Sequence, residues 1–296
     1  MLVHIAAVQM AAGSDPQQNL AKLETRVRQA AADGANLVVT QELVAHRFFL
    51  NFGWDPDLLD LAEELEQSTT VAWAVALAAE LGVVLPVNFL ERAGQVFYNT
   101  TAVVDADGRV AGTYRKTHMP LGSPTCYEKY YTTPGDGPFE VFDTAAGRLG
   151  CAICWDQWFP EVARILCLRG ADLLLYPTAI GSDCHDQWQT VMRGHAAANL
   201  VPVVAVNRVG TESDRRSADD AAVESDRDAH RTTYWGRSFI ADGTGRVVAQ
   251  AGEADDETIV AEVDLAAAKR ARNEWAVFRD RRPDLYRPLL TKDGRL

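Results

Sequence analysis

Cysteine is scarce in this chain of 296 residues and follows no regular spacing. The five cysteines stand at positions 126, 151, 154, 167 and 184, an odd number with irregular gaps. Disulfide frameworks belong mainly to short secreted chains, so the pattern argues against one. We therefore expect reduced thiols and a cytoplasmic protein.

Long apolar runs are missing as well. The most apolar window, VAWAVALAAELGVVLPVNFL at residues 71–90, is broken by Glu80, Gly82, Pro86 and Asn88. Because a membrane-spanning helix needs about 20 mostly apolar residues, we interpret this window as a core helix followed by a strand. The N-terminal residues MLVHIAAVQM also lack the basic region and cleavage site of a signal peptide. The sequence thus predicts no membrane partner.

Positive charge is in deficit. The chain has 29 lysines and arginines against 41 aspartates and glutamates, a net charge of −12. This disfavours nucleic acid as a partner, because binding phosphates requires a concentrated positive surface. One segment, Lys269 to Arg287, has seven basic and three acidic residues. We interpret it as solvated or facing another subunit, with a polyanion site as the alternative.

Neither a Gly/Ser-rich linker nor a solenoid repeat divides the chain, so we expect a single domain over residues 1–296. Thr211 to Arg231 (TESDRRSADDAAVESDRDAHR) is dense in charge and nearly free of bulky apolar residues. Such a composition cannot bury a core, so we expect an exposed loop there.

Strand and helix signals alternate along the rest of the chain. LVHIAAVQ at 2–9 indicates a buried strand, and Asp15-Pro16 indicates a helix start because Asp is a good N-cap and Pro fits the first helical position. The remaining expected elements are a helix ending at Gly34, strands at 36–40 and 83–90, a helix at roughly 57–81, hairpins at 98–116 and 236–252, helices near 160–168 and 186–199, and strands at 171–177 and 201–207. This mixture of crossover units and hairpins predicts an α/β sandwich with mixed sheets.

Two cysteines lie three residues apart in GCAICWDQWFPEVAR, residues 150–164. A structural zinc site needs a second ligand pair, which is absent, and a redox CxxC sits at the start of a helix. Cys151 instead lies within a strand pattern, and strand positions three apart point to opposite faces. Cys154 ends that strand before a turn and a helix, where open α/β sheets place ligands. We therefore expect Cys154 to be a nucleophile, Cys151 a bystander, and no metal at either.

Two charged residues also follow predicted strands. Glu42 comes directly after NLVVTQ, and Lys116 ends the first hairpin. A carboxylate can accept a thiol proton, while an ammonium can lower a thiol pKa and stabilise an oxyanion. A single acid or lysine at such a position can equally be structural, and the spacing does not show that the three groups meet.

Four blocks carry a family resemblance: QEL at 41–43, YRKTHMP at 114–120, CAICWDQWFPEVAR at 151–164 and LLLYPTAIG at 173–181. The chain resembles the nitrilase, or carbon–nitrogen hydrolase, superfamily. This resemblance implies a four-layer αββα sandwich of two mixed β-sheets and a Glu–Lys–Cys triad of Glu42, Lys116 and Cys154, without metal or organic cofactor. CYEKYYTTPG at 126–135 places the family's fourth acid at Glu128.

Within the superfamily, the chain is most similar to the N-carbamoylputrescine amidase branch. The similar blocks are CWDQWFPE, YPTAIGS, RGHAAANLVPVVAVNRVG (193–210), YWGRSFIA (234–241) and FRDRRPDLY (278–286). The resemblance implies hydrolysis of the ureido group of N-carbamoylputrescine to putrescine, ammonia and carbon dioxide. It also implies a homodimer or larger homo-oligomer that uses a C-terminal segment at about 266–296.

The resemblance assigns a role to each site residue. Glu42 would act as the base and Cys154 as the nucleophile, forming a thioester-like intermediate. Lys116 and the backbone N–H of Trp155 would stabilise the oxyanion. Glu128 would position Lys116 or the substrate amide, or be an ion-pair partner only.

Substrate contacts are expected from four further residues. Asp183 follows YPTAIGS and would face the far amine of the substrate, or else cap a helix. Trp158, Trp235 and Tyr130 would line the pocket or pack in the core, and the side chain of Trp155 has the same two options.

The chain departs from the branch at His46, Arg47 and Arg237. Because an arginine suits a substrate carboxylate, these residues leave a carbamoyl amino acid open as the substrate. Another carbamoyl amine or an ω-amide is also possible. A non-catalytic binding protein on the same scaffold is the alternative of a different class, and the intact triad argues against it.

Overall fold

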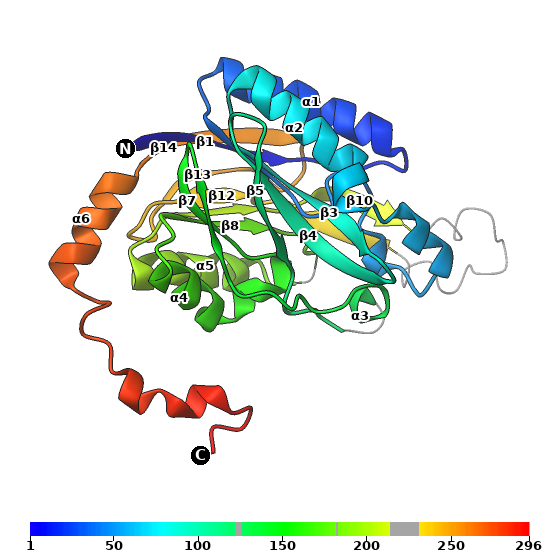
Figure 1. Ribbon diagram of the computed structural model, residues 1–296. Helices are drawn as coiled ribbons and strands as arrows, with labels where there is room; N and C mark the ends of the chain where they lie inside the picture. The colour runs from blue at the N-terminus through cyan, green and yellow to red at the C-terminus, as the bar shows by residue number, and fades with distance from the viewer. Residues whose placement is uncertain (122–125, 182, 214–230, 296) are drawn as a thin grey trace.

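Two β-sheets pack face to face, with helices on both outer faces (Figure 1). The computed structural model describes residues 1–121, 126–181, 183–213 and 231–295. Helices α1 (Pro16–Ala32) and α2 (Thr69–Leu81) cover one sheet, and α4 (Pro160–Leu168) and α5 (His185–Asn199) cover the other. The predicted four-layer αββα sandwich is confirmed.

The first sheet consists of two three-stranded parts in the order β14-β1-β2 and β3-β4-β5. A parallel bridge between Leu37 and Val84 joins them. The strands are β1 (Leu2–Gln9), β2 (Leu37–Thr40), β3 (Leu85–Ala93), β4 (Val96–Val104), β5 (Val110–Arg115) and β14 (Glu257–Asp264). The β1–β2 pair is parallel and the β1–β14 pair antiparallel, so the sheet is mixed.

The second sheet has the order β13-β12-β9-β8-β7-β6. Its strands are β6 (Val141–Thr144), β7 (Gly147–Cys151), β8 (Leu173–Pro177), β9 (Val203–Val206), β12 (Phe239–Ala241) and β13 (Val247–Gln250). The central β7, β8 and β9 are parallel and the outer strands antiparallel. Both predicted hairpins are confirmed, as β4–β5 and β12–β13.

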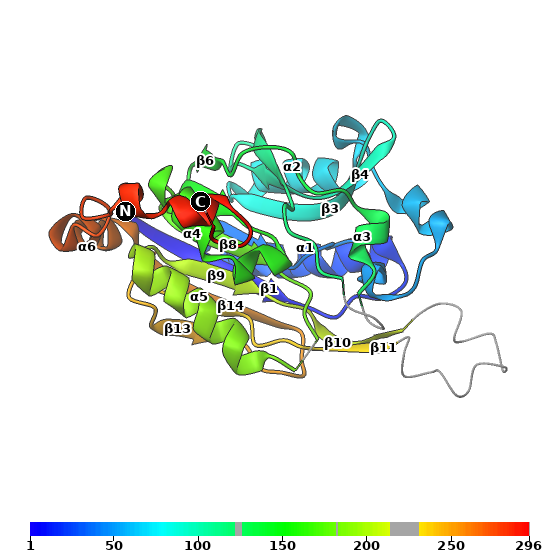
Figure 2. The ribbon, with the colours of Figure 1, turned by 90° about the horizontal axis from the view of Figure 1, so that it is seen from below.

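The remaining elements lie outside the two sheets. The hairpin of β10 (Val209–Ser213) and β11 (Arg231–Trp235) projects from the end of the molecule opposite α6 (Leu265–Trp275) (Figures 1 and 2). The short α3 (Glu128–Tyr131) lies at the same end as this hairpin. Beyond α6 the chain leaves the body and forms two short 3₁₀ helices, Pro283–Leu285 and Arg287–Leu290.

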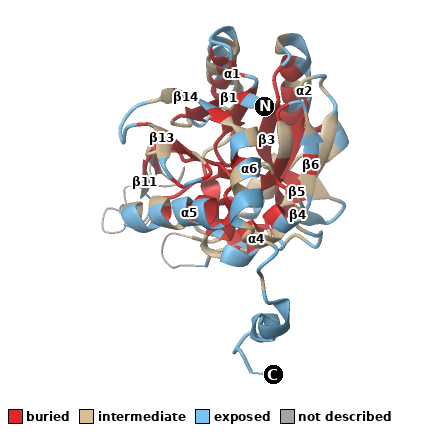
Figure 3. Ribbon diagram, turned by 90° about the vertical axis from the view of Figure 1, so that its left-hand side faces the viewer, coloured by how far each residue is buried: buried red, intermediate tan, exposed pale blue. Residues whose placement is uncertain are grey.

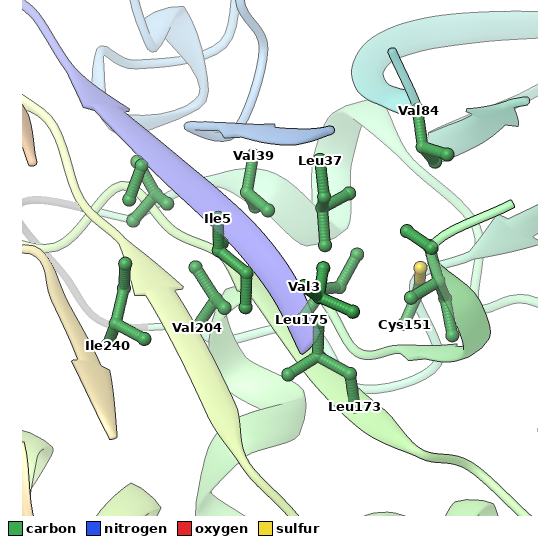
Figure 4. Packing of buried hydrophobic residues seen from close by; sticks show 14 of the residues in the cluster. Val3, Ile5, Leu37, Val39, Val84, Cys151, Leu173, Leu175, Val204 and Ile240 are labelled. Carbon is green, nitrogen blue, oxygen red and sulfur yellow. The ribbon is translucent and has the colours of Figure 1, made fainter. Parts of the chain in front are cut away.

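The main core fills the space between the sheets. Figure 4 shows Ile5 of β1 and Val39 of β2 facing Leu175 of β8 and Val204 of β9, with Cys151 in the same layer. Side chains on both inner faces interdigitate, which is how two sheets exclude water from their interface. Two further apolar clusters lie beneath the outer helices, and the outer helix faces are exposed (Figure 3).

The long helix predicted at about 57–81 is wrong in its first half. Residues 56–67 instead form two 3₁₀ helices, Pro56–Leu61 and Leu65–Gln67, and α2 begins at Thr69. Its start is fixed by two side chains: Ser68 Oγ accepts from the Val71 N–H at 3.0 Å, and the Glu63 carboxylate accepts from the Thr69 N–H at 2.8 Å. N-capping satisfies donors that a helix leaves free, so a helix begins where such caps are available.

The exposed loop predicted at 211–231 is wrong at its first residues. Thr211 to Ser213 belong to β10, and Glu212 is buried. The high density of charged residues predicted exposure, but Glu212 is buried because it pairs with a buried arginine, Arg208. Residues 214–230 of the predicted loop lie outside the described residues.

The apolar window at 71–90 forms all of α2 except its first two residues and most of β3, a helix followed by a strand as predicted. Among the helices that the structure describes, none has the length and hydrophobicity needed to cross a membrane.

Candidate active site

Four predicted site residues lie where secondary-structure elements begin or end. Glu42 follows β2, Lys116 follows β5, Glu128 begins α3, and Cys154 begins a 3₁₀ helix, Cys154–Trp158. All four are buried. Glu42 and Lys116 thus follow strands of the first sheet, and the 3₁₀ helix of Cys154 follows β7 of the second.

Glu42, Lys116 and Glu128 are in direct contact. Lys116 Nζ lies 2.9 Å from Glu42 Oε1 and 2.7 Å from Glu128 Oε2. Asn99 of β4 donates from Nδ2 to both carboxylates, at 2.7 Å to Glu42 Oε1 and 3.0 Å to Glu128 Oε1. One ammonium and one amide thus hold two buried carboxylates.

The second oxygen of Glu42 has a different environment. Glu42 Oε2 is buried and accepts no hydrogen bond from the described residues. Leaving a buried carboxylate oxygen without a donor is costly, so such an atom suggests a functional use. Its lone pairs are available to a proton from a thiol or from a substrate.

Cys154 occupies a strained turn. Its φ is +46°, in the left-handed region that residues with a Cβ disfavour, and its Sγ lies 3.9 Å from the Ala179 carbonyl oxygen. The residue retains 5% of its surface exposed, whereas Cys151 retains none. The prediction that Cys154 ends the strand is wrong: β7 ends at Cys151, whose side chain joins the core between the sheets. All five cysteines are free thiols.

Asp156 explains why the chain turns at Cys154. Its Oδ2 accepts from the Ile153 N–H at 3.0 Å and from the Tyr114 hydroxyl at 2.7 Å. Its Oδ1 accepts from the His118 N–H at 2.9 Å and lies 2.8 Å from His118 Nδ1. One buried carboxylate therefore ties the Cys154 turn to the segment that carries Lys116.

Burial is the main influence on the pKa of the Cys154 thiol. Burial raises the pKa of Cys154 well above its usual value, the Glu42 charge raises it further, and Lys116 acts in the opposite direction. The expected lowering of the thiol pKa by an ammonium is thus present but outweighed. A nucleophilic role for this sulfur would therefore call for a base that removes its proton.

Glu42 and Glu128 both pair with the single ammonium of Lys116. Burial opposes the charge on Lys116, but Glu128 and Glu42 raise the pKa of its ammonium well above the ordinary value. Burial raises the pKa of Glu128 to about 7, with Lys116 acting against this and Glu42 with it. Desolvation of the carboxylate is therefore the main cause, and the negative charge of Glu42 adds to it.

The predicted substrate-binding residues differ in burial and in their aromatic contacts. Trp158 packs edge-on against Trp155, with ring centroids 6.2 Å apart, and its buried Nε1 donates to none of the described residues. Trp235 is buried against Trp188 at 5.1 Å and His185 at 4.6 Å. Tyr130 is 59% exposed and tilts against Trp54 and Tyr127. Their roles toward a substrate stay predictions.

The next residues to place are Asp183 and the three at which the chain departs from the amidase branch, His46, Arg47 and Arg237. The side chain of Asp183 is fully exposed and lies 3.7 Å from His185 Nδ1. The N-cap of α5 is Cys184, so Asp183 does not cap this helix. Arg47 donates to the Ser213 carbonyl at 2.6 Å, and Arg237 lies 3.7 Å from both Asp186 and Glu253. His46 is half-buried, and burial lowers its pKa.

Comparison with known proteins identifies the family of the chain. Residues 4–273 match the carbon-nitrogen hydrolase family. The chain belongs to this family. It is therefore an enzyme that hydrolyses carbon–nitrogen bonds, with an α/β nitrilase-like fold, as the sequence predicted.

Several relatives align over nearly the whole chain. The chain is 45% identical to the N-carbamoylputrescine amidase of Arabidopsis thaliana over 99% of this chain and 97% of that protein. It is 43% identical to a citrullinase of Francisella tularensis over 98% and 99% of the two chains. A carbon–nitrogen hydrolase of Helicobacter pylori G27 superimposes with a TM-score of 0.90 at 37% identity, covering 99% of each chain.

Sequence reasoning missed Asn99, Arg208 and Asp156. Each is a polar residue within or beside a strongly apolar stretch: YNTTAVV for Asn99, VPVVAVNR for Arg208 and CAICWD for Asp156. A buried polar residue requires partners, so these positions carried a signal that could have been used. In the described part of the chain, no group of three or more His, Cys, Asp or Glu side chains is arranged to hold a metal ion.

Proposed function

We propose that this hydrolase cleaves the ureido group of N-carbamoylputrescine to putrescine, ammonia and carbon dioxide, a reaction that would supply polyamine biosynthesis. The observation that carries the proposal is the buried contact of Lys116 with Glu42 and Glu128, beside a cysteine on a strained turn. Relatives that bear the name N-carbamoylputrescine amidase, 44–45% identical over 99% of the chain, support the choice of substrate.

In the proposed reaction, Cys154 Sγ attacks the ureido carbon while Glu42 Oε2 accepts the thiol proton. The carbon–nitrogen bond then breaks, and Glu42 returns the proton to the departing nitrogen, leaving a thioester-like carbamoyl group on Cys154. A water molecule, deprotonated by Glu42, attacks this group and releases the thiol. The resulting carbamate, or carbamic acid, loses carbon dioxide, so one water yields one ammonia, one amine and one carbon dioxide.

Lys116 has two tasks in this proposal. Its ammonium holds Glu42 through Oε1, which leaves Oε2 for the proton. It also stabilises the developing oxyanion, together with the Trp155 N–H at the first turn of the 3₁₀ helix. Glu128 positions Lys116 by accepting from its ammonium, and Asn99 supports Glu128 by donating to its other oxygen.

The charged groups favour an amine at the far end of the substrate. Arg47 donates to the Ser213 carbonyl and Arg237 lies 3.7 Å from both Asp186 and Glu253, so both guanidiniums have partners within the protein. Asp183, whose carboxylate is fully exposed, can pair with an amine instead. Trp158, Trp235 and Tyr130 would line the pocket between the ureido end and the amine end of the substrate.

A carbamoyl amino acid such as citrulline is the second candidate, because the citrullinase relative is nearly as similar. Ammonia release from a panel of carbamoyl amines, carbamoyl amino acids and ω-amides separates the two. We expect kcat/KM for N-carbamoylputrescine to exceed that for citrulline by at least about tenfold, because the Asp183 carboxylate would attract the far amine and repel the carboxylate of citrulline. A preference for citrulline would reject the amine assignment.

Cys154→Ala and Cys151→Ala form the matched control pair. Both remove a sulfur from a buried residue, but only the first removes the proposed nucleophile. Loss of turnover in Cys154→Ala with retention in Cys151→Ala is expected. Full turnover in Cys154→Ala would reject the enzyme mechanism.

We also propose a homodimer or larger homo-oligomer joined through residues at about 266–296. Several apolar side chains there are exposed, namely Trp275, Leu285, Leu289 and Leu290. Exposed apolar groups gathered on one segment are typical of an interaction site. The free thiols support a reducing compartment, so we propose the cytoplasm as the location.

A further inference from the structure

The turn that follows Glu42 is held by the side chain of Arg208. Leu43 has a φ of +49°, a conformation that leucine disfavours. The Arg208 guanidinium donates to the carbonyls of Glu42 and His46, each at 2.7 Å from Nη2, and to that of Leu43. On the other side of the turn, Asn88 Oδ1 accepts from the Leu43 N–H at 2.7 Å. The turn is thus fixed from both sides.

Glu212 completes this arrangement from the β10–β11 hairpin. Its Oε1 lies 2.7 Å from Arg208 Nη1, and its Oε2 accepts from the Phe48 N–H at 2.6 Å. The ion pair therefore holds the segment from Glu42 to Phe48 at both of its ends. Three residues beyond this segment, Asn51 Nδ2 donates to the Tyr234 hydroxyl of the hairpin at 3.0 Å.

Both side chains are unavailable to a substrate. Arg208 is fully buried and Glu212 nearly so, and their polar atoms are used in the contacts described. An arginine is required here because its planar fork reaches several carbonyls and a carboxylate at once, whereas a lysine ammonium is a single donor centre. Burying this guanidinium without Glu212 would leave an unpaired charge.

We propose that Arg208 and Glu212 are positioning residues for the catalytic base. They fix the turn that orients the Glu42 carboxylate toward Cys154, and they make this orientation depend on the β10–β11 hairpin. This inference rests on the proposed function, in which Glu42 is the base.

A double-mutant cycle with Glu42→Gln tests the proposal. Arg208→Lys keeps the charge but loses the fork, and we expect kcat for N-carbamoylputrescine to fall about 10²-fold with little change in KM, the effect of a base displaced by about 1 Å. Alkylation of Cys154 by iodoacetamide, followed by mass spectrometry, gives a second readout that needs no substrate. Arg208→Lys should shift this rate in the same direction as Glu42→Gln, and should add no further shift in the Glu42→Gln background.

Equal shifts in both backgrounds would overturn the proposal, because Arg208 would then act on the fold rather than through Glu42. If Arg208→Lys does not fold, Glu212→Gln carries the same cycle, since its amide keeps an acceptor for the Phe48 N–H. Arg272→Lys is the matched control: this arginine of α6 is also mostly buried and bonds to the Ala171 carbonyl and Asp172, both at 3.3 Å. It should leave the alkylation rate unchanged.

The alkylation readout also separates this proposal from the choice of substrate. Coupling between Arg208 and Glu42 in a protein that does not hydrolyse N-carbamoylputrescine would support the positioning pair and reject the substrate alone.

Discussion

At the scale of single residues, the site is governed by an imbalance of buried charge. Glu42 and Glu128 share the ammonium of Lys116, and Asn99 supplies the only amide that contacts both among the described residues. Burial, which disfavours the charged carboxylate, is the main cause of the raised pKa of Glu128, and the charge of Glu42 adds to it. The same imbalance makes the cluster sensitive to pH.

Glu128→Gln tests this imbalance. The pKa of Glu128 rises from 4.5 to about 7, so between these values the folded protein binds a proton that the unfolded chain has released. The contribution of Glu128 to the free energy of unfolding therefore falls as pH rises through this window, by at most about 1.4 kcal/mol per pH unit. Lys116 stays charged throughout, because its pKa is raised above its ordinary 10.5.

Urea unfolding of both proteins across this pH range provides the measurement. The stability of the wild-type protein relative to Glu128→Gln should decrease with rising pH. A relative stability that stays constant or increases would contradict the assignment.

At the scale of elements, the site depends on how strands and turns end. The end of β2 places Glu42, the end of β5 places Lys116, and the turn after β7 places Cys154. Sequence patterns predicted these strand ends because apolar runs stop where polar residues begin. The turn after β7 was predicted imperfectly, since its shape depends on Asp156 and on partners more than 30 residues away in the chain.

Asp156→Asn tests the link between the Cys154 turn and the Lys116 segment. Asp156 accepts from Tyr114, Ile153 and His118, and an amide keeps only one oxygen for these donors. We expect a loss of about 1–3 kcal/mol in the free energy of unfolding, because a buried donor loses its acceptor. kcat should fall as well, since both Cys154 and Lys116 lose a support.

Asp143→Asn is a suitable control, because Asp143 is an exposed aspartate of β6 that pairs with Arg148 at the surface. Exposed pairs contribute little to stability, so this variant should match the wild-type protein. Unchanged kcat in Asp156→Asn, measured by ammonia release, would show that the link has no bearing on catalysis.

At the scale of the whole molecule, the chain beyond α6 has few contacts with the body. It extends away from the sandwich and ends in exposed side chains (Figures 1 and 3). Leu290 is 84% exposed, far more than a leucine in a packed tail. A second copy of the chain is the partner that we propose for this segment.

Replacing Leu289 and Leu290 with glutamate tests this assembly. Charges at both positions would prevent burial of the tail in a subunit interface, because an unpaired carboxylate resists desolvation. Light scattering after size exclusion should show the wild-type protein at a multiple of 32.4 kDa and the double variant at a smaller mass. Val96→Glu, at the start of β4, places a charge on another part of the surface and should leave the mass unchanged. A wild-type monomer would reject the proposed assembly.

The sequence by itself determined the fold class, the family and three residues of the candidate site. Periodicity and turn residues are local properties, so the alternation of strands and helices could be read from them. Glu42 and Lys116 stood out because charged side chains followed apolar strands, Cys154 because it preceded a turn and a helix, and Glu128 only through the family resemblance.

Only the tertiary structure decided how these residues are held. Asn99 contacts two carboxylates, and Asp156 contacts His118. Arg208 contacts Glu212 and the Glu42 turn. These contacts join segments far apart in the chain or depend on burial. A charged residue such as Glu212 is solvated or buried according to whether a partner reaches it, and neither composition nor periodicity contains that information. The packing of the two sheets brings the partners within hydrogen-bonding distance.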